Sequence, residues 1–143
     1  MNAARLYTPE LLALAVELAD YPPLAKATCR GEARSPACGS TLALDLALDA
    51  EGRIAGLGLR ARACAVGQAA AAIFARHAAG RDAAALDAAQ QAIADWLAAQ
   101  GERPDWPDLG LLEAARAYPG RHGAMLLPWR AALAALSTRA GAG

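Results

Sequence analysis

Two cysteines, Cys38 and Cys64, lie in the sequence contexts that best support chemistry. Cys38 stands between small residues in the loop-like segment 35–40, SPACGS, where a thiol has little packing purpose. Cys64 stands at the expected start of a helix, where the positive end of the helix dipole favours a thiolate. Thiolates are nucleophiles and metal ligands, so the pair predicts a reactive-thiol site or a metal site.

Three further side chains must be weighed for the same site. His122 is a candidate third ligand, because two thiolates alone do not complete a zinc site. Cys29 is more simply a small apolar strand residue, and it becomes a ligand only if its strand runs beside the segment 35–40. His77 is expected about 20 Å from Cys64 along one helix, so it cannot share a metal with it.

Two runs of alternating apolar residues, 41–48 and 53–60, separate the two cysteines. In 41–48 leucine alternates with threonine, alanine or aspartate, which is typical of a strand with one buried face. With the turn 49–52 the pattern predicts a β-hairpin that brings Cys38 and Cys64 to one end of a small sheet. Asp45 should then face solvent. Residues 26–31 are a weaker candidate for an edge strand.

Helices are expected on both sides of the hairpin. Thr8-Pro9-Glu10 begins the first, since it combines a hydroxyl cap, an early proline and an acid near the positive helix end. The others are expected from Cys64 to about Ala79, after the cap Asp82, over 109–117 after the cap Asp108, and over 125–135 with Pro128 near the first turn. The chain therefore predicts an α+β fold, with a small antiparallel sheet of about three strands packed on one face by several helices. We expect a single domain over 1–143, with a frayed tail at 136–143.

The composition excludes several function classes. Fourteen lysines and arginines balance 14 aspartates and glutamates, so no basic field is available for nucleic acid. The three tryptophans lack interleaved basic residues and are interpreted as packing anchors. No apolar run reaches the roughly 20 residues of a membrane span, and the first residues do not resemble a secretory leader. We expect a cytoplasmic protein that binds neither nucleic acid nor membrane.

The order of these features resembles the iron–sulfur cluster assembly scaffold family, which includes IscU, SufU and the N-terminal domain of NifU. Members have a Pro-Xaa-Cys-Gly-Asp loop before a hairpin, a Gly-Cys motif that opens a helix, and a third cysteine at the start of the C-terminal helix. Segments 35–39, 63–69 and 118–129 match these elements in order. The resemblance implies the family's fold and a carrier role without catalytic turnover.

Two of the family's ligand positions differ in this sequence. The loop aspartate is replaced by Ser40, and the third cysteine falls on Ala124. Cys38 and Cys64 alone keep a ligand side chain among the four usual positions. The resemblance places these residues beside the site: Gly39, Ser40, Arg121 and Ala124.

Three functions stay open at this point. The first is a divergent scaffold or carrier that accepts sulfur on Cys38 or Cys64 from a cysteine desulfurase. It would transiently hold iron or a labile iron–sulfur cluster for client proteins, with sharing between two copies of a homodimer as one way to complete the ligands. The second is a metal-free interaction protein that binds a desulfurase or a client. The third is a zinc-binding sulfur acceptor.

Overall fold

Three antiparallel strands form one sheet in the order β1-β2-β3. They are β1 (Cys29–Arg34), β2 (Thr41–Leu48) and β3 (Ile54–Arg62). The structure, a computed structural model, describes residues 7–142. The hairpin expected from residues 41–60 is therefore present, and the weak edge-strand signal corresponds to β1, displaced by three residues from the predicted 26–31.

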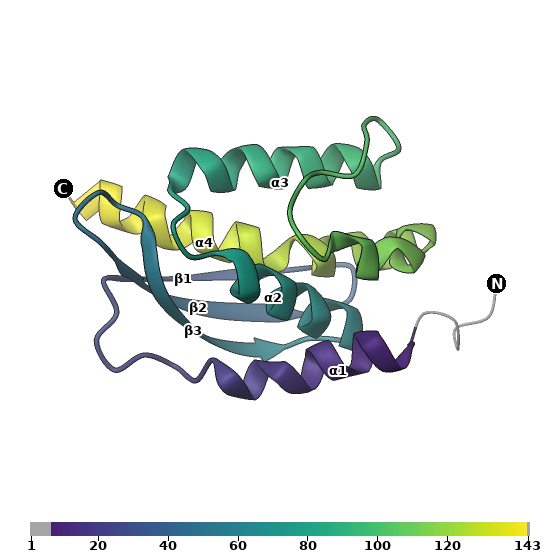
Figure 1. Cartoon of the computed structure of the whole chain (residues 1–143), viewed down its shortest axis with the longest axis horizontal. Helices are drawn as coiled ribbons and strands as arrows, with labels where there is room; N and C mark the ends of the chain where they lie inside the picture. The colour runs from purple at the N-terminus through teal and green to yellow at the C-terminus, as the bar shows by residue number, and fades with distance from the viewer. Residues whose placement is uncertain (1–6, 143) are drawn as a thin grey trace.

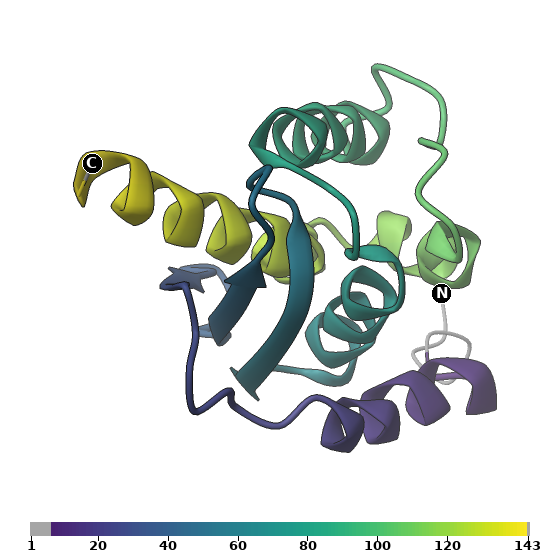
Figure 2. The same cartoon turned by 60° about the vertical axis from the view of Figure 1, so that its left-hand side comes forward.

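Helices cover the leucine-bearing face of this sheet (Figure 1). They are α1 (Pro9–Glu17) with the short 3-10 turn η2 (Leu18–Asp20), α2 (Ala65–His77), α3 (Ala83–Leu97), the 3-10 segments η3 (Leu109–Ala117) and η4 (Pro119–Arg121), and α4 (His122–Ala142). Figure 2 shows α2 and α4 against the sheet, with α1 alongside α2 and α3 packed on α4. The predicted α+β architecture is confirmed. No helix within residues 7–142 is both long and apolar enough to cross a membrane.

The two faces of β2 follow the alternation of its sequence. Leu42, Leu44 and Leu46 are buried beneath the helices. On the same face of β1, Gly31 touches the α4 backbone so closely that a Cβ there would overlap Ala131 and Ala135. The absence of a side chain at this position therefore allows α4 to lie directly on the sheet.

Burial also confirms the tryptophans as packing anchors. Trp106 and Trp129 contact Phe74, with the three ring centroids between 5.1 and 5.6 Å apart, and Trp96 is a buried residue of α3. Such aromatic groups contribute large apolar areas to a core. Here the Phe74, Trp106 and Trp129 rings pack three segments against one another: α2, α4, and the loop that precedes η3.

Asp45 departs from the sequence prediction. It lies on the face opposite the leucines, as alternation requires, but it is only 3% exposed. The segment 22–24 crosses this face, and the backbone N–H of Leu24 donates to Oδ2 at 3.0 Å. Arg30 Nε donates to Oδ1 at 3.1 Å. The prediction of a solvated carboxylate is therefore wrong, because a connecting segment covers it and satisfies both of its oxygens.

Two helix predictions also need correction. Asp108 does not cap η3 with its side chain; it has a φ of +71°, and its carboxylate accepts from His77 Nε2 at 2.7 Å and from Arg76 at 3.3 Å. The last helix, α4, begins at His122 and extends to Ala142, beyond both predicted ends, and Pro128 lies inside it. A local cap pattern could not predict the contact of Asp108 with His77, which lies 31 residues away in the chain.

Gly58→Ala should destabilise the fold by about 1–3 kcal/mol, because an added Cβ would overlap the carbonyl of Pro22 and lie 2.9 Å from the Leu24 nitrogen. Gly56→Ala is the matched control on the same strand, since its Cβ would meet only the Ala47 Cβ at 3.8 Å. Urea unfolding of both variants measures the difference. Equal free energies of unfolding would contradict the packing of segment 22–24 on the sheet.

Candidate functional site

The loop that carries Cys38 and the helix start that carries Cys64 meet at one end of the sheet. Thr41 at the start of β2 pairs with Arg34 on one side and Arg62 on the other. The chain leaves β1 at Arg34 into the loop 35–40, and it leaves β3 at Arg62 into α2, for which Cys64 is the N-cap residue. Sheet register therefore brings together two residues that are distant in sequence, as the hairpin pattern predicted.

The hydroxyl of Ser40 bridges these two segments. Its Oγ lies 3.1 Å from Cys38 Sγ, and it accepts a hydrogen bond from the Cys64 backbone N–H at 3.4 Å. Ser40 is only 3% exposed, so this hydroxyl is held in place by its surroundings. When Cys38 is a thiolate, the same hydroxyl can donate its hydrogen to the sulfur.

Ser35 places a second hydroxyl near the same sulfur, 3.6 Å from Cys38 Sγ. The loop is closed by two backbone bonds, Ser35 N–H to the Ser40 carbonyl and Gly39 N–H to the Ser35 carbonyl, both at 2.8 Å. Gly39 has a φ of +73°, which suits glycine at this turn. Sequence reasoning missed Ser35 as a site residue; its spacing of three from Cys38 across a proline-containing turn was the available signal.

These contacts act on the acidity of Cys38. The hydrogen bond with the Ser40 hydroxyl is the largest influence and lowers the pKa of the Cys38 thiol below its ordinary value. Partial burial opposes this effect, while Ser35, the Ser40 backbone and the positive charge of Arg121 lower the pKa further. Cys38 is therefore a half-buried loop thiol whose surroundings stabilise the thiolate.

The start of α4 closes the other side of the site. Gly123 lies against the Ser35 side chain, and a Cβ there would overlap its hydroxyl. Ala124 is fully buried against the first turn of α2, where a Cβ on Gly67 would be 3.4 Å from the Ala124 Cβ. Ala124, where the resemblance places a third cysteine, thus packs one helical turn beyond Cys64, but its methyl group offers no ligand.

The remaining candidates do not join the two thiols. His122 Nε2 donates to the Arg116 carbonyl at 2.8 Å, a backbone partner in η3. Cys29 is buried and pairs with Leu46, about 20 Å along β1 from the loop. Among residues 7–142 there is no group of three or more His, Cys, Asp or Glu side chains placed to hold a metal ion. One copy therefore brings two thiols together, with hydroxyls and a nearby arginine.

Solved structures resemble this chain over nearly its whole length. A nitrogen-fixing NifU-like protein (N-terminal) from Brucella abortus matches with a TM-score of 0.86 and 27% identity, covering 96% of each chain. An iron–sulfur cluster assembly scaffold protein for the SUF system from Fervidobacterium islandicum AW-1 matches with a TM-score of 0.80 and 18% identity. That match covers 94% of this chain and 99% of the other.

A hypothetical protein is also similar, with a TM-score of 0.71 and 18% identity over 90% of this chain and 97% of its own. No family model matches the sequence, and neither does any curated protein. The likeness is thus carried by structure more than by sequence. This chain has the fold of the NifU-like N-terminal domain and of the SufU scaffold protein, and the resemblance to the iron–sulfur cluster assembly scaffold family is confirmed.

Proposed function

We propose that this chain acts as a single-domain sulfur-accepting carrier in cytoplasmic iron–sulfur cluster assembly, with Cys38 as the acceptor in preference to Cys64. The observation that carries this proposal is the Cys38 thiol, flanked by the buried hydroxyls of Ser35 and Ser40 and lowered in pKa. The likeness in fold to a NifU-like N-terminal domain and to a scaffold protein of the SUF system supports it. The role is that of a carrier, without turnover of its own.

The proposed step is a thiol–persulfide exchange. The Cys38 thiolate attacks the outer sulfur of a persulfide on a cysteine desulfurase, and a new S–S bond forms on Cys38. The donor's S–S bond breaks, and its electron pair leaves with the donor cysteine as a thiolate, so no external oxidant or reductant is needed. The Ser40 hydroxyl holds the attacking thiolate, and the charge of Arg121 favours the anionic persulfide that results.

Iron or a cluster is cargo in this proposal. Iron–sulfur clusters usually take four thiolates, and one copy supplies only Cys38 and Cys64 at this end of the sheet. Two copies related by a two-fold axis would supply four. We propose that a labile cluster, or iron, is held between the two copies of such a dimer and passed to client proteins.

A metal-free interaction protein is the second candidate. It is favoured by the absence of any three-ligand group within the described part of the chain. Such a protein would use the scaffold fold to bind a desulfurase or a client. The zinc-binding sulfur acceptor is less favoured, since His122 would have to leave the Arg116 carbonyl to become a ligand.

Ser40→Ala should raise the pKa of Cys38 and slow its alkylation by iodoacetamide at neutral pH by about threefold to tenfold, because each unit of pKa changes the thiolate fraction about tenfold. In the wild type the alkylation rate should reach its plateau at lower pH than in the variant, because a thiol of lower pKa is fully ionised at lower pH. Mass spectrometry of the Cys38 peptide gives the rate. Ser35→Ala should have a smaller effect, because its contact is longer.

Ser137→Ala, at an exposed position on α4, is the control for that series. It should leave the pH profile of Cys38 unchanged. A profile that Ser40→Ala does not move would refute the thiolate-stabilising role of this hydroxyl.

Anaerobic incubation with a cysteine desulfurase and cysteine should place a persulfide on Cys38 of the wild type. Cys38→Ser should lose most of this label, whereas Cys29→Ser, which removes a buried thiol outside the site, should retain it. Iron and acid-labile sulfide per chain, measured on protein purified anaerobically, report the cargo. If Cys38→Ser carries the persulfide on Cys64, then Cys64 is the acceptor. If no cysteine carries a persulfide, sulfur acceptance is refuted and the metal-free interaction protein is the remaining candidate.

Restoring the two missing ligand side chains should create a metal site within one copy. Ser40→Asp combined with Ala124→Cys should retain about one zinc or iron per chain, because the four family positions would then carry a carboxylate and three thiols. Ala134→Cys with Ser40→Asp is the matched control, since it adds a thiol elsewhere on α4. Equal metal content in both double variants, measured by elemental analysis, would show that Ala124 does not occupy the ligand position.

A further inference from the structure

The sheet face opposite the helices carries a charged trough, which we call the outer trough. Its floor is formed by the small β2 residues Thr41 and Ala43. Register places Arg34 and Arg62 on either side of Thr41, and Glu32 and Arg60 on either side of Ala43. Paired residues of an antiparallel sheet project from the same face, so long side chains on β1 and β3 wall a floor of short ones. The hollow over Thr41 and Ala43 measures about 390 Å³. A neighbouring hollow of about 470 Å³ extends from Ala43 past Asp45 and across the β1 edge to Ala134 and Thr138 of α4.

The charge of the outer trough is positive, although the chain as a whole is neutral. Arg34, Arg60 and Arg62 are exposed, and none of them takes part in an ion pair among the residues that the structure describes. Glu32 is the single exposed acid in the walls, because Asp45 is buried and already paired with Arg30. Three arginines without carboxylate partners therefore face one glutamate.

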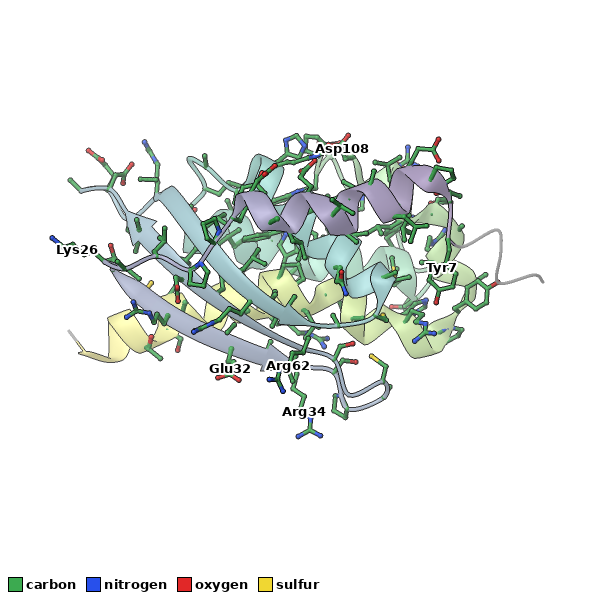
Figure 3. The ribbon with its side chains drawn as sticks, turned by 90° about the horizontal axis from the view of Figure 1, so that it is seen from below. Tyr7, Lys26, Glu32, Arg34, Arg62 and Asp108 are labelled. Atoms are coloured by element: carbon green, nitrogen blue, oxygen red, sulfur yellow. The ribbon has the colours of Figure 1, made fainter. Side chains whose placement is uncertain are left out.

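The two ends of the outer trough differ. At one end the segment 22–24 crosses the sheet above Gly58 and covers Asp45. At the other end, Arg34 and Arg62 directly precede the loop 35–40 and the turn into Cys64. Figure 3 shows Glu32, Arg34 and Arg62 gathered on this face beside that loop. An occupant of the trough would therefore reach the open end next to the thiols.

We propose that the outer trough docks an extended acidic segment of a partner protein. A chain lying along β2 fits a narrow floor between two walls, and Arg60 and Arg62 are two residues apart on one strand. Alternate carboxylates of an extended chain recur about every 6.6 Å, the same spacing as those two arginines. Nucleic acid fits less well, because no aromatic ring lines the trough to stack on a base. The surface does not depend on sulfur acceptance by Cys38.

The test uses the full chain and a fluorescein-labelled ten-residue peptide with glutamate at alternate positions and threonine between. Fluorescence anisotropy should show binding that weakens with salt, and the glutamine analogue of the peptide should not bind. Arg60→Glu with Arg62→Glu should weaken binding by about tenfold or more. Arg53→Glu with Arg130→Glu, which makes the same charge change at exposed positions outside the trough, should leave it nearly unchanged.

Glu32→Gln provides a variant of opposite sign, and it should tighten binding by about twofold to fivefold by removing the only repulsive carboxylate of the walls. Amide NMR shifts caused by the peptide should fall in residues 30–34, 41–45 and 58–62. Cys38→Ser should bind the peptide as the wild type does, which separates this proposal from the sulfur-transfer step. The proposal is overturned if both arginine pairs weaken binding equally, if Glu32→Gln does not tighten it, or if a single-stranded oligonucleotide of equal charge binds more tightly than the peptide.

Discussion

The hydroxyl of Ser40 is the contact on which the candidate site depends. It touches the Cys38 sulfur and the Cys64 backbone nitrogen, and it thereby joins the loop after β1 to the start of α2. An aspartate at this position, as in the resembled family, would place a negative charge beside the sulfur and disfavour the thiolate unless a cation intervened. The serine does the opposite, because a neutral donor stabilises the thiolate without offering a hard metal ligand. This difference supports the proposal that Cys38 acts as a reactive thiol.

The two faces of the sheet that supports the site differ: helices cover one, and the other is partly exposed. The leucine face is covered by α2 and α4. Because Gly31 has no side chain, α4 lies close to β1, and because Gly67 has none, α2 lies close to Ala124 of α4. The opposite face is only half covered, since segment 22–24 crosses it at Asp45 and leaves the rows of Thr41 and Ala43 open. The exposed arginines Arg34, Arg60 and Arg62 lie on the open part of this face, next to the segments that carry the two cysteines.

Much of this arrangement could be predicted from the sequence. Strict alternation placed β2 at residues 41–48, and the pairing of β2 with β3 followed from the turn between them. Periodicity, however, specifies the side of a sheet and not what covers it, so Asp45 was assigned to solvent. The cap pattern at Asp108 failed for a similar reason, because His77 and Arg76 compete for its carboxylate from a distant helix. Contacts between remote segments decide both cases, and a local pattern does not contain them.

In the candidate site, too, the sequence predicts some residues, while others are identified only by the contacts that they make in the folded protein. Cys38 and Cys64 could be singled out from their neighbours in the chain. For Ser35 the sequence offers only its spacing from Cys38, because its contact with that thiol is made by the folded loop. Ala124 gives the complementary case. It lies where the resemblance puts a third thiol, fully buried and facing the turn of α2 in which Gly67 leaves space. Position 124 therefore offers a methyl group and no ligand, and the chemistry that we propose for one copy rests on the Cys38 thiolate and on Cys64.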